Sequence, residues 1–522
     1  MQTAFPQELW EPVFHSENTH WADSILANLS EQDRIAQLFM VAAYSNKATL
    51  DKEEISALIK DYKIGGLMFL QGSPEKQAKL TNDFQSLSET PLMIALDAEW
   101  GLSMRLDSVM RFPWQMSLGA IQDDDLIYKM GEQIAKQCKL LGVNINFAPV
   151  ADINSNPKNP IIGNRSFGES PKKVSKFSAA YMQGMQDNGI LACAKHFPGH
   201  GDTDSDSHET LPVIRHSRYR LNTTEIAPFR HLITKGLGSI MVAHLRIPVI
   251  DATKNLASSL SKKVVTNLLK KELGFQGLVF TDALNMKGVS KFFQAGELDV
   301  KALLAGNDIL LMSEDVPVAI EKIQKAILDG KITQEEIDAR CKKILMAKKW
   351  MGLDSILPIN IKNITSRINN SDAELVNRKL VENSLTLLQN YENLIPFQRL
   401  DTLKIAAITI GGNSEHFTNM LSNYAHITHF SIDESPSSEM QRELLDKLVG
   451  FNLVVASIHQ SNESPWKTHK IARNTDLFLQ TLAIQSKVVV SVFANPYTIN
   501  HFLFTNSFDG FIMAYQNSKI TQ

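Results

Sequence analysis

Short apolar segments rich in β-branched residues alternate with longer amphipathic segments over the first 350 residues. The segments between the apolar runs have helical periodicity, and several end at or near a glycine, as helices do. Eight of the apolar segments have the length of buried strands: 36–44, 65–70, 91–97, 143–152, 190–196, 238–244, 277–283 and 307–312. This alternation predicts a (β/α)8 TIM-like barrel.

The pattern changes after residue 352. Residues 353–371 have no clear period, which indicates a linker between a barrel at 1–352 and a second domain at 372–522. Four further strand candidates alternate there with helical segments, which predicts a smaller, doubly wound α/β sandwich domain: 404–412, 452–459, 487–494 and 510–515. Gly411 and Gly412 end the first of these strands, but the third glycine and the acidic residue of a dinucleotide fingerprint are missing, which favours a plain turn.

Composition excludes several classes of protein. The 53 basic residues against 56 acidic ones give a net charge of −3, which argues against a general nucleic-acid binder. No apolar run reaches the ~18 residues needed to span a bilayer. The first residues show no signal peptide, a pattern that cytoplasmic and processed periplasmic or secreted proteins share, so the compartment stays open. Three widely spaced cysteines form neither a disulfide framework nor a CxxC metal site.

Several predicted strands of the barrel end in a polar or ionisable residue. In such barrels the chemistry lies at the C-terminal ends of the strands and in the loops that follow them. Strand ends are also where a chain meets water, so these endings alone do not establish a site. The residues are Asp97, Asp152, His196, His244 and Asp282.

One segment concentrates ionisable groups to an unusual degree. Residues 195–208 read KHFPGHGDTDSDSH, with three histidines, three aspartates and a lysine. Its glycines and proline predict a loop after the first two residues. Three interpretations compete: a solvated surface loop, a metal site built from His and Asp, and an acid–base pair in which Asp206 orients His208.

The same segment resembles the signature loop of the β-N-acetylglucosaminidase branch of glycoside hydrolase family 3. Its K-H, P-G-H-G-D-T and D-S-H parts are all in register, so the match is far more specific than a short motif. Three further segments resemble that family in the right order: LDAEWGLSMRL (96–106), NPIIGNRSFGESP (159–171) and GLVFTDALNMKGV (277–289). The resemblance extends over residues 30–350 and is weaker in the second half.

The resemblance implies a retaining glycosidase that acts without a cofactor or a metal. Asp282 would be the nucleophile, and His208, oriented by Asp206, would be the acid/base. An unperturbed histidine pKa of about 6.5 lies close to neutral pH, which suits that role. The family pattern also assigns sugar binding to five residues: Asp97, Arg105, Arg165, Lys195 and His196. Asp97 and Arg105 are equally able to pair with each other across the barrel mouth.

The expected activity is therefore exo-β-N-acetylglucosaminidase, with a carbohydrate that carries terminal N-acetylglucosamine as the partner. Two positions depart from the family pattern: Trp100 replaces a glycine after Glu99, and Ala283 follows Asp282 in place of a second aspartate. The alternatives are a phosphorylase or another family 3 β-glycosidase, a metal-dependent hydrolase, and an inactive carbohydrate-binding module. The natural aglycone, the role of the second domain and the oligomeric state stay open.

Overall fold

The computed structural model describes residues 11–15, 18–47, 49–204, 210–412, 414–461 and 470–522. The chain divides into two compact units. The first contains residues 1–112 and 123–376, and the second contains 113–122 and 377–522. The boundaries expected from the sequence, at 352 and 372, remain a prediction about domains. The expected linker includes a short helix, α14 (Ile364–Ile368).

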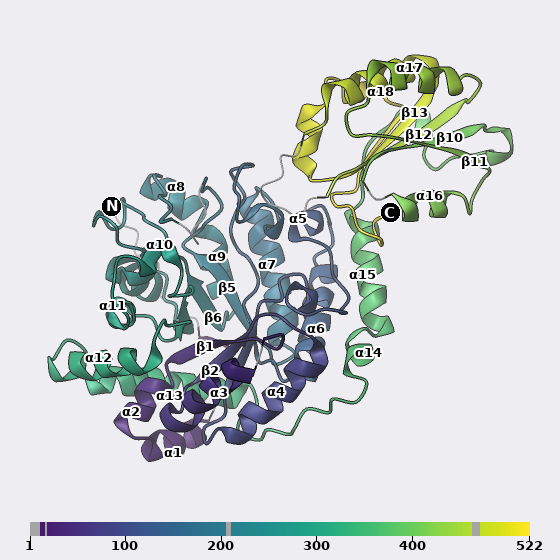
Figure 1. Ribbon diagram of the computed structural model, residues 1–522. Helices are drawn as coiled ribbons and strands as arrows, with labels where there is room; N and C mark the ends of the chain where they lie inside the picture. Colours follow the sequence, from purple (N-terminus) through teal and green to yellow (C-terminus); the bar gives the residue numbers. More distant parts are fainter. Residues whose placement is uncertain (1–10, 16–17, 48, 205–209, 413, 462–469) are drawn as a thin grey trace. The chain divides into compact units, whose positions relative to one another are not determined.

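The first unit is a parallel eight-stranded barrel, as predicted (Figure 1). Its strands follow the order β7-β6-β5-β4-β3-β2-β1-β8, and a bridge between Phe280 and Ile309 connects β7 to β8. The strands are β1 (Phe39–Ala43), β2 (Gly66–Phe69), β3 (Met93–Leu96), β4 (Ile145–Asn146), β5 (Leu191–Phe197), β6 (Ser239–Val242), β7 (Leu278–Thr281) and β8 (Leu310–Leu311). Every residue of β2, β3, β5, β6 and β7 is buried, as expected for parallel strands covered on both faces.

Helices surround this barrel (Figure 1). Several begin at a capping residue followed by proline, because proline suits the first turn and the cap satisfies a free backbone N–H: Ser73 caps α4 and Ser170 caps α7. The α-helices of this unit, besides α14, are α1 (His20–Asn28), α2 (Glu31–Ala36), α3 (Thr49–Ala57), α4 (Pro74–Leu87), α6 (Asp125–Leu140), α7 (Pro171–Gln186), α8 (Arg218–Thr223), α9 (Ala227–Ile233), α10 (Lys287–Ser290), α11 (Glu297–Ala305), α12 (Val316–Leu328) and α13 (Gln334–Trp350). Two segments are wound as π-helices: Leu58–Tyr62 and Lys263–Glu272.

The second unit is a six-stranded sheet with the order β11-β10-β12-β13-β14-β9. Its strands are β9 (Thr386–Asn390), β10 (Ile405–Gly411), β11 (Ile427–Ile432), β12 (Leu453–His459), β13 (Lys487–Phe493) and β14 (Gly510–Met513). The helices are α5 (Gln115–Leu118), α16 (Glu415–Leu421), α17 (Ser438–Lys447) and α18 (Arg473–Gln485), and the division between the units falls within α15 (Ser371–Ser384). The edge strand β9 is antiparallel to β14, so the sheet is mixed, whereas the sequence predicted parallel strands only.

Alternating side chains of this sheet enter two separate apolar cores. Ala406, Ile408 and Ile410 of β10 belong to the core beneath α17 and α18, whereas Ile405 belongs to the core that includes Phe417 of α16. Figure 1 shows α17 and α18 on one face of the sheet and α16 on the other. Because successive side chains of a strand point to opposite faces, burial of both sets shows that the sheet is covered on both faces.

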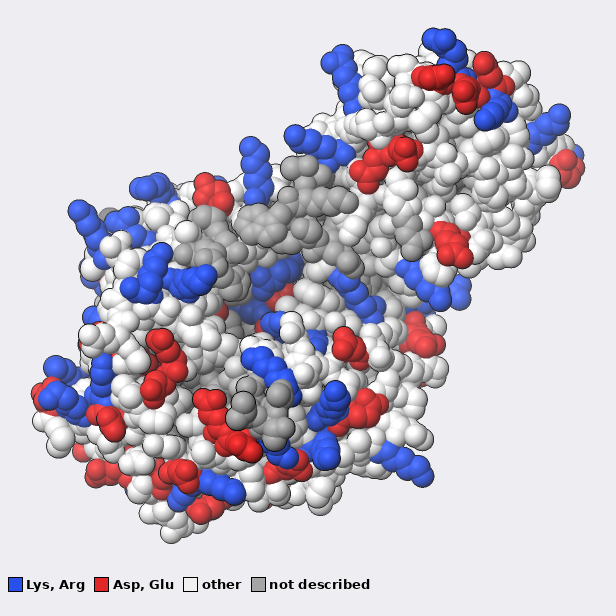
Figure 2. Space-filling view, viewed as in Figure 1, with Lys and Arg blue, Asp and Glu red and all other residues white. Residues whose placement is uncertain are grey.

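Acidic and basic side chains are interspersed over the face drawn in Figure 2, in keeping with the small net charge. Among the described residues, no helix has the length and apolar character needed to cross a bilayer.

Candidate active site

The predicted site residues that the structure describes lie at the C-terminal ends of the barrel strands. Asp97 directly follows β3, Lys195 and His196 lie near the end of β5, and Asp282 directly follows β7. Arg165 ends a short turn of helix, Gly163–Arg165, in the connection after β4. The fold therefore supplies side chains to the site from strands far apart in the sequence, as barrel enzymes do.

Asp97 is bound by two cations. Its Oδ1 lies 2.7 Å from Lys195 Nζ, and its Oδ2 accepts a hydrogen bond from Arg105 Nη2. Burial would raise the pKa of this carboxyl, but the charges of Lys195 and Arg105 outweigh burial and hold the pKa well below its usual range. The pairing of Asp97 with Arg105 that the sequence left open is thus present, and the roles of both residues toward a sugar remain predictions.

Glu99 is the central anion of the site, although the sequence suggested no role for it. Its side chain is completely buried, and its Oε1 lies 2.8 Å from Lys195 Nζ. Arg165 binds both of its oxygens, with Nε 2.9 Å from Oε2 and Nη2 2.7 Å from Oε1. Burial would raise the pKa of Glu99, yet Arg165 and Lys195 lower it to about 2. A charged Glu99 therefore holds both cations in place.

Asp152 fixes the orientation of His196. The Nδ1 atom of His196 lies 2.7 Å from Asp152 Oδ2, and the backbone N–H of His196 also donates to this carboxylate. At 3.5 Å, Arg165 Nη2 faces the other ring nitrogen, Nε2. Because a carboxylate accepts and a guanidinium donates, this network fits a neutral His196 protonated at Nδ1. Asp152 ends a predicted strand in the sequence, so its position was foreseen but its role was not.

The loop after β5 is anchored to the same aspartate. The backbone N–H of His200 donates to Asp152 Oδ1 at 2.7 Å, and the His200 ring bonds Thr203 through Nδ1 at 2.8 Å. Burial lowers the pKa of His200 to about 4. Gly201 is required here, since a Cβ would lie 1.7 Å from the carbonyl oxygen of Ile153. Neutral His200 is thus a structural element of the loop.

Asp282 is half-buried, and its own Oδ1 accepts a hydrogen bond from the backbone N–H of Ala283 at 2.8 Å. Its backbone N–H donates to Val242 of β6. Its negative charge raises the pKa of the His200 imidazole and so opposes the effect of burial on that group. On the adjoining strand end, buried His244 bonds Ser259 Oγ through Nδ1 at 2.7 Å and the Ala283 carbonyl through Nε2 at 3.1 Å. His244 therefore supports the backbone beside the predicted nucleophile.

The predicted acid/base pair, Asp206 and His208, lies outside the described residues, so its geometry stays a prediction. Within the described residues, no three His, Cys, Asp or Glu side chains are grouped as a metal ion would require.

Trp100, the departure from the family pattern, is half-buried, and the Arg111 guanidinium lies 5.5 Å from its ring centre.

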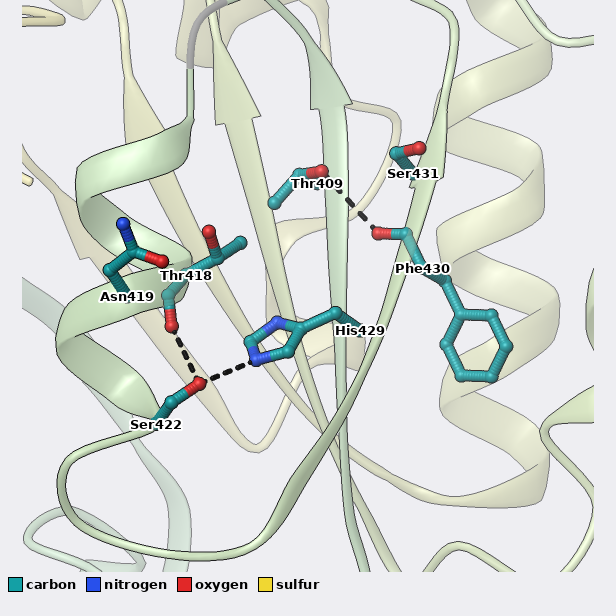
Figure 3. A pocket seen from close by; sticks show the side chains of 7 residues that line it. All are labelled: Thr409, Thr418, Asn419, Ser422, His429, Phe430 and Ser431. Atoms are coloured by element: carbon teal, nitrogen blue, oxygen red, sulfur yellow. Dashed lines mark hydrogen bonds between the residues drawn. The ribbon is translucent and has the colours of Figure 1, made fainter.

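A separate polar pocket of about 320 Å³ lies in the second unit. Its lining side chains come from α16, from Ser422 directly after it, and from the strands β10 and β11 (Figure 3). Ser422 Oγ lies 2.8 Å from His429 Nε2, and Thr409 donates to the Phe430 carbonyl. The pocket is lined by Thr409, Thr418, Asn419, Ser422, His429, Phe430 and Ser431.

A family model for the glycosyl hydrolase family 3 N-terminal domain matches residues 31–347. The chain belongs to glycosyl hydrolase family 3. The family resemblance seen in the sequence is thereby confirmed. The matched region contains every described residue of the candidate site.

The chain is also similar to individual members. It is 36% identical over 331 residues to beta-hexosaminidase A of Pseudoalteromonas piscicida, an alignment that covers 56% of this chain and 55% of that protein. The chain thus spans about half the length of that relative. A solved structure of a family 3 beta-N-acetylglucosaminidase from Paenibacillus sp. str. FPU-7 is 30% identical with a TM-score of 0.76, covering 94% of this chain and 95% of that one. A beta-glucoside phosphorylase, BglX, shares the fold with a TM-score of 0.82 at 22% identity, covering 98% and 94%.

Proposed function

We propose that this protein is a retaining exo-β-N-acetylglucosaminidase that removes terminal β-linked N-acetylhexosamine from oligosaccharides or peptidoglycan-derived glycans. The proposal rests on the hydrogen-bond donors of the buried Lys195 ammonium group. Its ammonium group has three N–H donors, and its described contacts with Asp97 and Glu99 account for two of them. A buried cation with one further donor, at the mouth of a family 3 barrel, suits a sugar hydroxyl.

The other binding residues fit the same role. Each oxygen of a carboxylate accepts more than one hydrogen bond, so Asp97 can bind a sugar hydroxyl while it retains Lys195 and Arg105. Bonds to charged groups are the stronger kind. Arg165 and His196 would complete a site for a neutral, hydroxyl-rich ring. The names of the two similar proteins, a beta-hexosaminidase and a beta-N-acetylglucosaminidase, support an N-acetylated sugar as substrate.

The reaction would proceed in two displacements at the anomeric carbon. In the first, a carboxylate oxygen of Asp282 forms a bond to that carbon while the glycosidic bond breaks, and His208 gives its proton to the leaving oxygen. In the second, His208 takes a proton from water, the water oxygen bonds to the anomeric carbon, and the Asp282 carboxylate departs. Asp206 would stabilise the imidazolium form of His208.

The test is a hydrolysis assay that compares an aryl N-acetyl-β-glucosaminide with the matching aryl β-glucoside. The proposal expects faster turnover of the first, equal rates with and without a chelator, and free sugar as the product in phosphate buffer. Activity lost to a chelator and restored by zinc would establish the metal-dependent alternative, and a sugar phosphate would establish a phosphorylase. A slowly hydrolysed fluorinated sugar should label Asp282, and Asp282→Ala should abolish turnover and labelling together.

A further inference from the structure

Two buried side chains hold the segment that carries two of the site's carboxylates, those of Asp97 and Glu99. Asp97 and Glu99 flank Ala98, immediately after β3. Asn146, the last residue of the neighbouring strand β4, pairs with Ala98 as a strand would: Ala98 N–H donates to Asn146 Oδ1 at 2.9 Å, and Asn146 Nδ2 donates to the Ala98 carbonyl at 3.3 Å. Leu96 and Asn146 are the last paired residues of strands β3 and β4. The Asn146 side chain therefore continues the hydrogen bonding between these two strands beyond their ends.

Tyr181 of α7 completes this arrangement. Its hydroxyl oxygen lies 2.8 Å from the Ala98 carbonyl oxygen and 3.1 Å from that of Glu99, so the hydroxyl donates to these carbonyls. The same hydroxyl oxygen accepts a hydrogen bond from Asn146 Nδ2 at 3.3 Å. Asn146 and Tyr181 have no solvent exposure. Burial also raises the pKa of Tyr181 well above its usual range, so the hydroxyl stays a donor. The backbone between the two carboxylates is thus bonded from two neighbouring elements.

We propose that Asn146 and Tyr181 are positioning residues, which set the separation of Asp97 and Glu99 and thereby the place of Lys195 for sugar recognition. This inference rests on the proposed function. Lys195 Nζ bridges the two carboxylates at 2.7 and 2.8 Å, so rotation of the peptide between them moves the ammonium group as well. A displacement of about 1 Å can cost an enzyme ~100-fold in rate.

Asn144 provides a matched control. It lies two residues before Asn146, and it makes the same kind of contact with the same strand: the Ile94 N–H donates to Asn144 Oδ1 at 3.0 Å. Ile94 lies within β3, three residues before Asp97. Loss of this bond should also cost stability, without moving either carboxylate.

The experiment compares full-length Asn146→Leu, Tyr181→Phe and Asn144→Leu with the wild type. For an aryl N-acetyl-β-glucosaminide, we expect the first two variants to lower kcat/KM about tenfold or more. The loss should lie mainly in KM, because the affected sugar contacts exist before the transition state. Free N-acetylglucosamine should inhibit these variants more weakly by the same factor. Asn144→Leu should stay within about twofold of the wild type in every kinetic constant.

Equal kinetic losses in all three variants, or none in the first two, would overturn the proposal. Tyr181→Phe keeps the aromatic packing, so it provides the answer if Asn146→Leu does not fold. Crystal structures of the variants give a readout that needs no turnover: the Lys195–Glu99 contact should be displaced in Tyr181→Phe and retained in Asn144→Leu. A wild type that hydrolyses no aryl glycoside would contradict the proposed function, whereas an undisturbed contact in Tyr181→Phe would contradict the positioning role.

Discussion

Arg165 binds Glu99 through two hydrogen bonds, of 2.9 and 2.7 Å, one to each carboxylate oxygen, and the Glu99 side chain is completely buried. Such two-point pairs fix direction as well as distance. Glu99 also forms an ion pair with Lys195, whose Nζ lies 2.8 Å from Glu99 Oε1. The cations proposed to bind the sugar are therefore arranged around a carboxylate that the protein itself supplies.

Glu99→Gln should destabilise the protein, because it leaves Arg165 and Lys195 with less compensating charge in a buried place. Breaking a buried ion pair costs about 3–5 kcal/mol, which calorimetric and denaturant unfolding would measure. The control is Glu272→Gln, since Glu272 accepts two bonds from Arg218 at 2.7 and 2.6 Å but is exposed. That exposed pair should contribute no more than about 1 kcal/mol. Equal losses in the two variants would contradict the role given to Glu99.

Asp152→Asn should impair activity more than stability. The substituted side chain keeps an oxygen for the His200 N–H, but its amide N–H₂ would face His196 Nδ1. His196 would then carry its proton on Nε2. That atom faces Arg165 and could no longer accept a hydrogen bond from it. We expect kcat/KM to fall by about 10–100-fold, the loss typical when a carboxylate that orients a functional histidine is removed, with a small change in Tm. Wild-type kinetics in this variant would show that the orientation of His196 is immaterial.

The eight strands of the barrel were predictable because each is a short, buried apolar run. β9 and β11 were not predicted, and both are edge strands whose side chains are mostly exposed or half-buried. Such strands lack the continuous apolar run by which a buried strand is predicted from sequence. The segment 113–122 belongs to the second unit although it lies inside the barrel sequence, and no local pattern signals that placement.

The site was predictable to a different degree. Asp97, Lys195 and His196 were found through strand ends and the family motif, and the structure joins them with Arg105 and Arg165 in one network of ion pairs and hydrogen bonds. Asn146 and Tyr181 were missed because their contacts with Ala98 connect residues 48 and 83 positions apart. Side-chain to backbone bonds of that range depend on the tertiary arrangement that brings β4 and α7 beside the segment after β3, which single-sequence periodicity does not encode.

His208→Ala should slow hydrolysis by an amount that depends on the leaving group. An aryl leaving group of low pKa needs little protonation, so its departure is partly spared, whereas an alkyl or sugar leaving group should suffer the general-acid loss of about 10²–10⁴. Rates for a series of aryl and alkyl N-acetyl-β-glucosaminides would measure this dependence. Equal losses across the series would indicate that His208 is structural and would leave the acid/base unassigned.

Asp299 should make the stability of the protein depend on pH. It lies in the first turn of α11 with 2% exposure and accepts a hydrogen bond from Ser313 Oγ. Burial raises the pKa of its carboxyl to about 6, although the bond from Ser313 opposes this. Between its ordinary value near 4 and about 6, the folded state keeps a proton that the unfolded state has released. The contribution of this group to the free energy of unfolding therefore falls as pH rises through that window and stays low above it.

Asp299→Asn imitates the protonated carboxyl and keeps an oxygen for Ser313, so the variant should lose this pH dependence. At pH 4 its free energy of unfolding should lie close to that of the wild type. At pH 8 it should exceed the wild type by up to about 3 kcal/mol, the free energy that corresponds to the change in pKa. Urea unfolding of both proteins at intervals between pH 4 and 8 measures the difference. A constant difference across the range would contradict the raised pKa of Asp299, because a group with the same pKa in both states adds no slope.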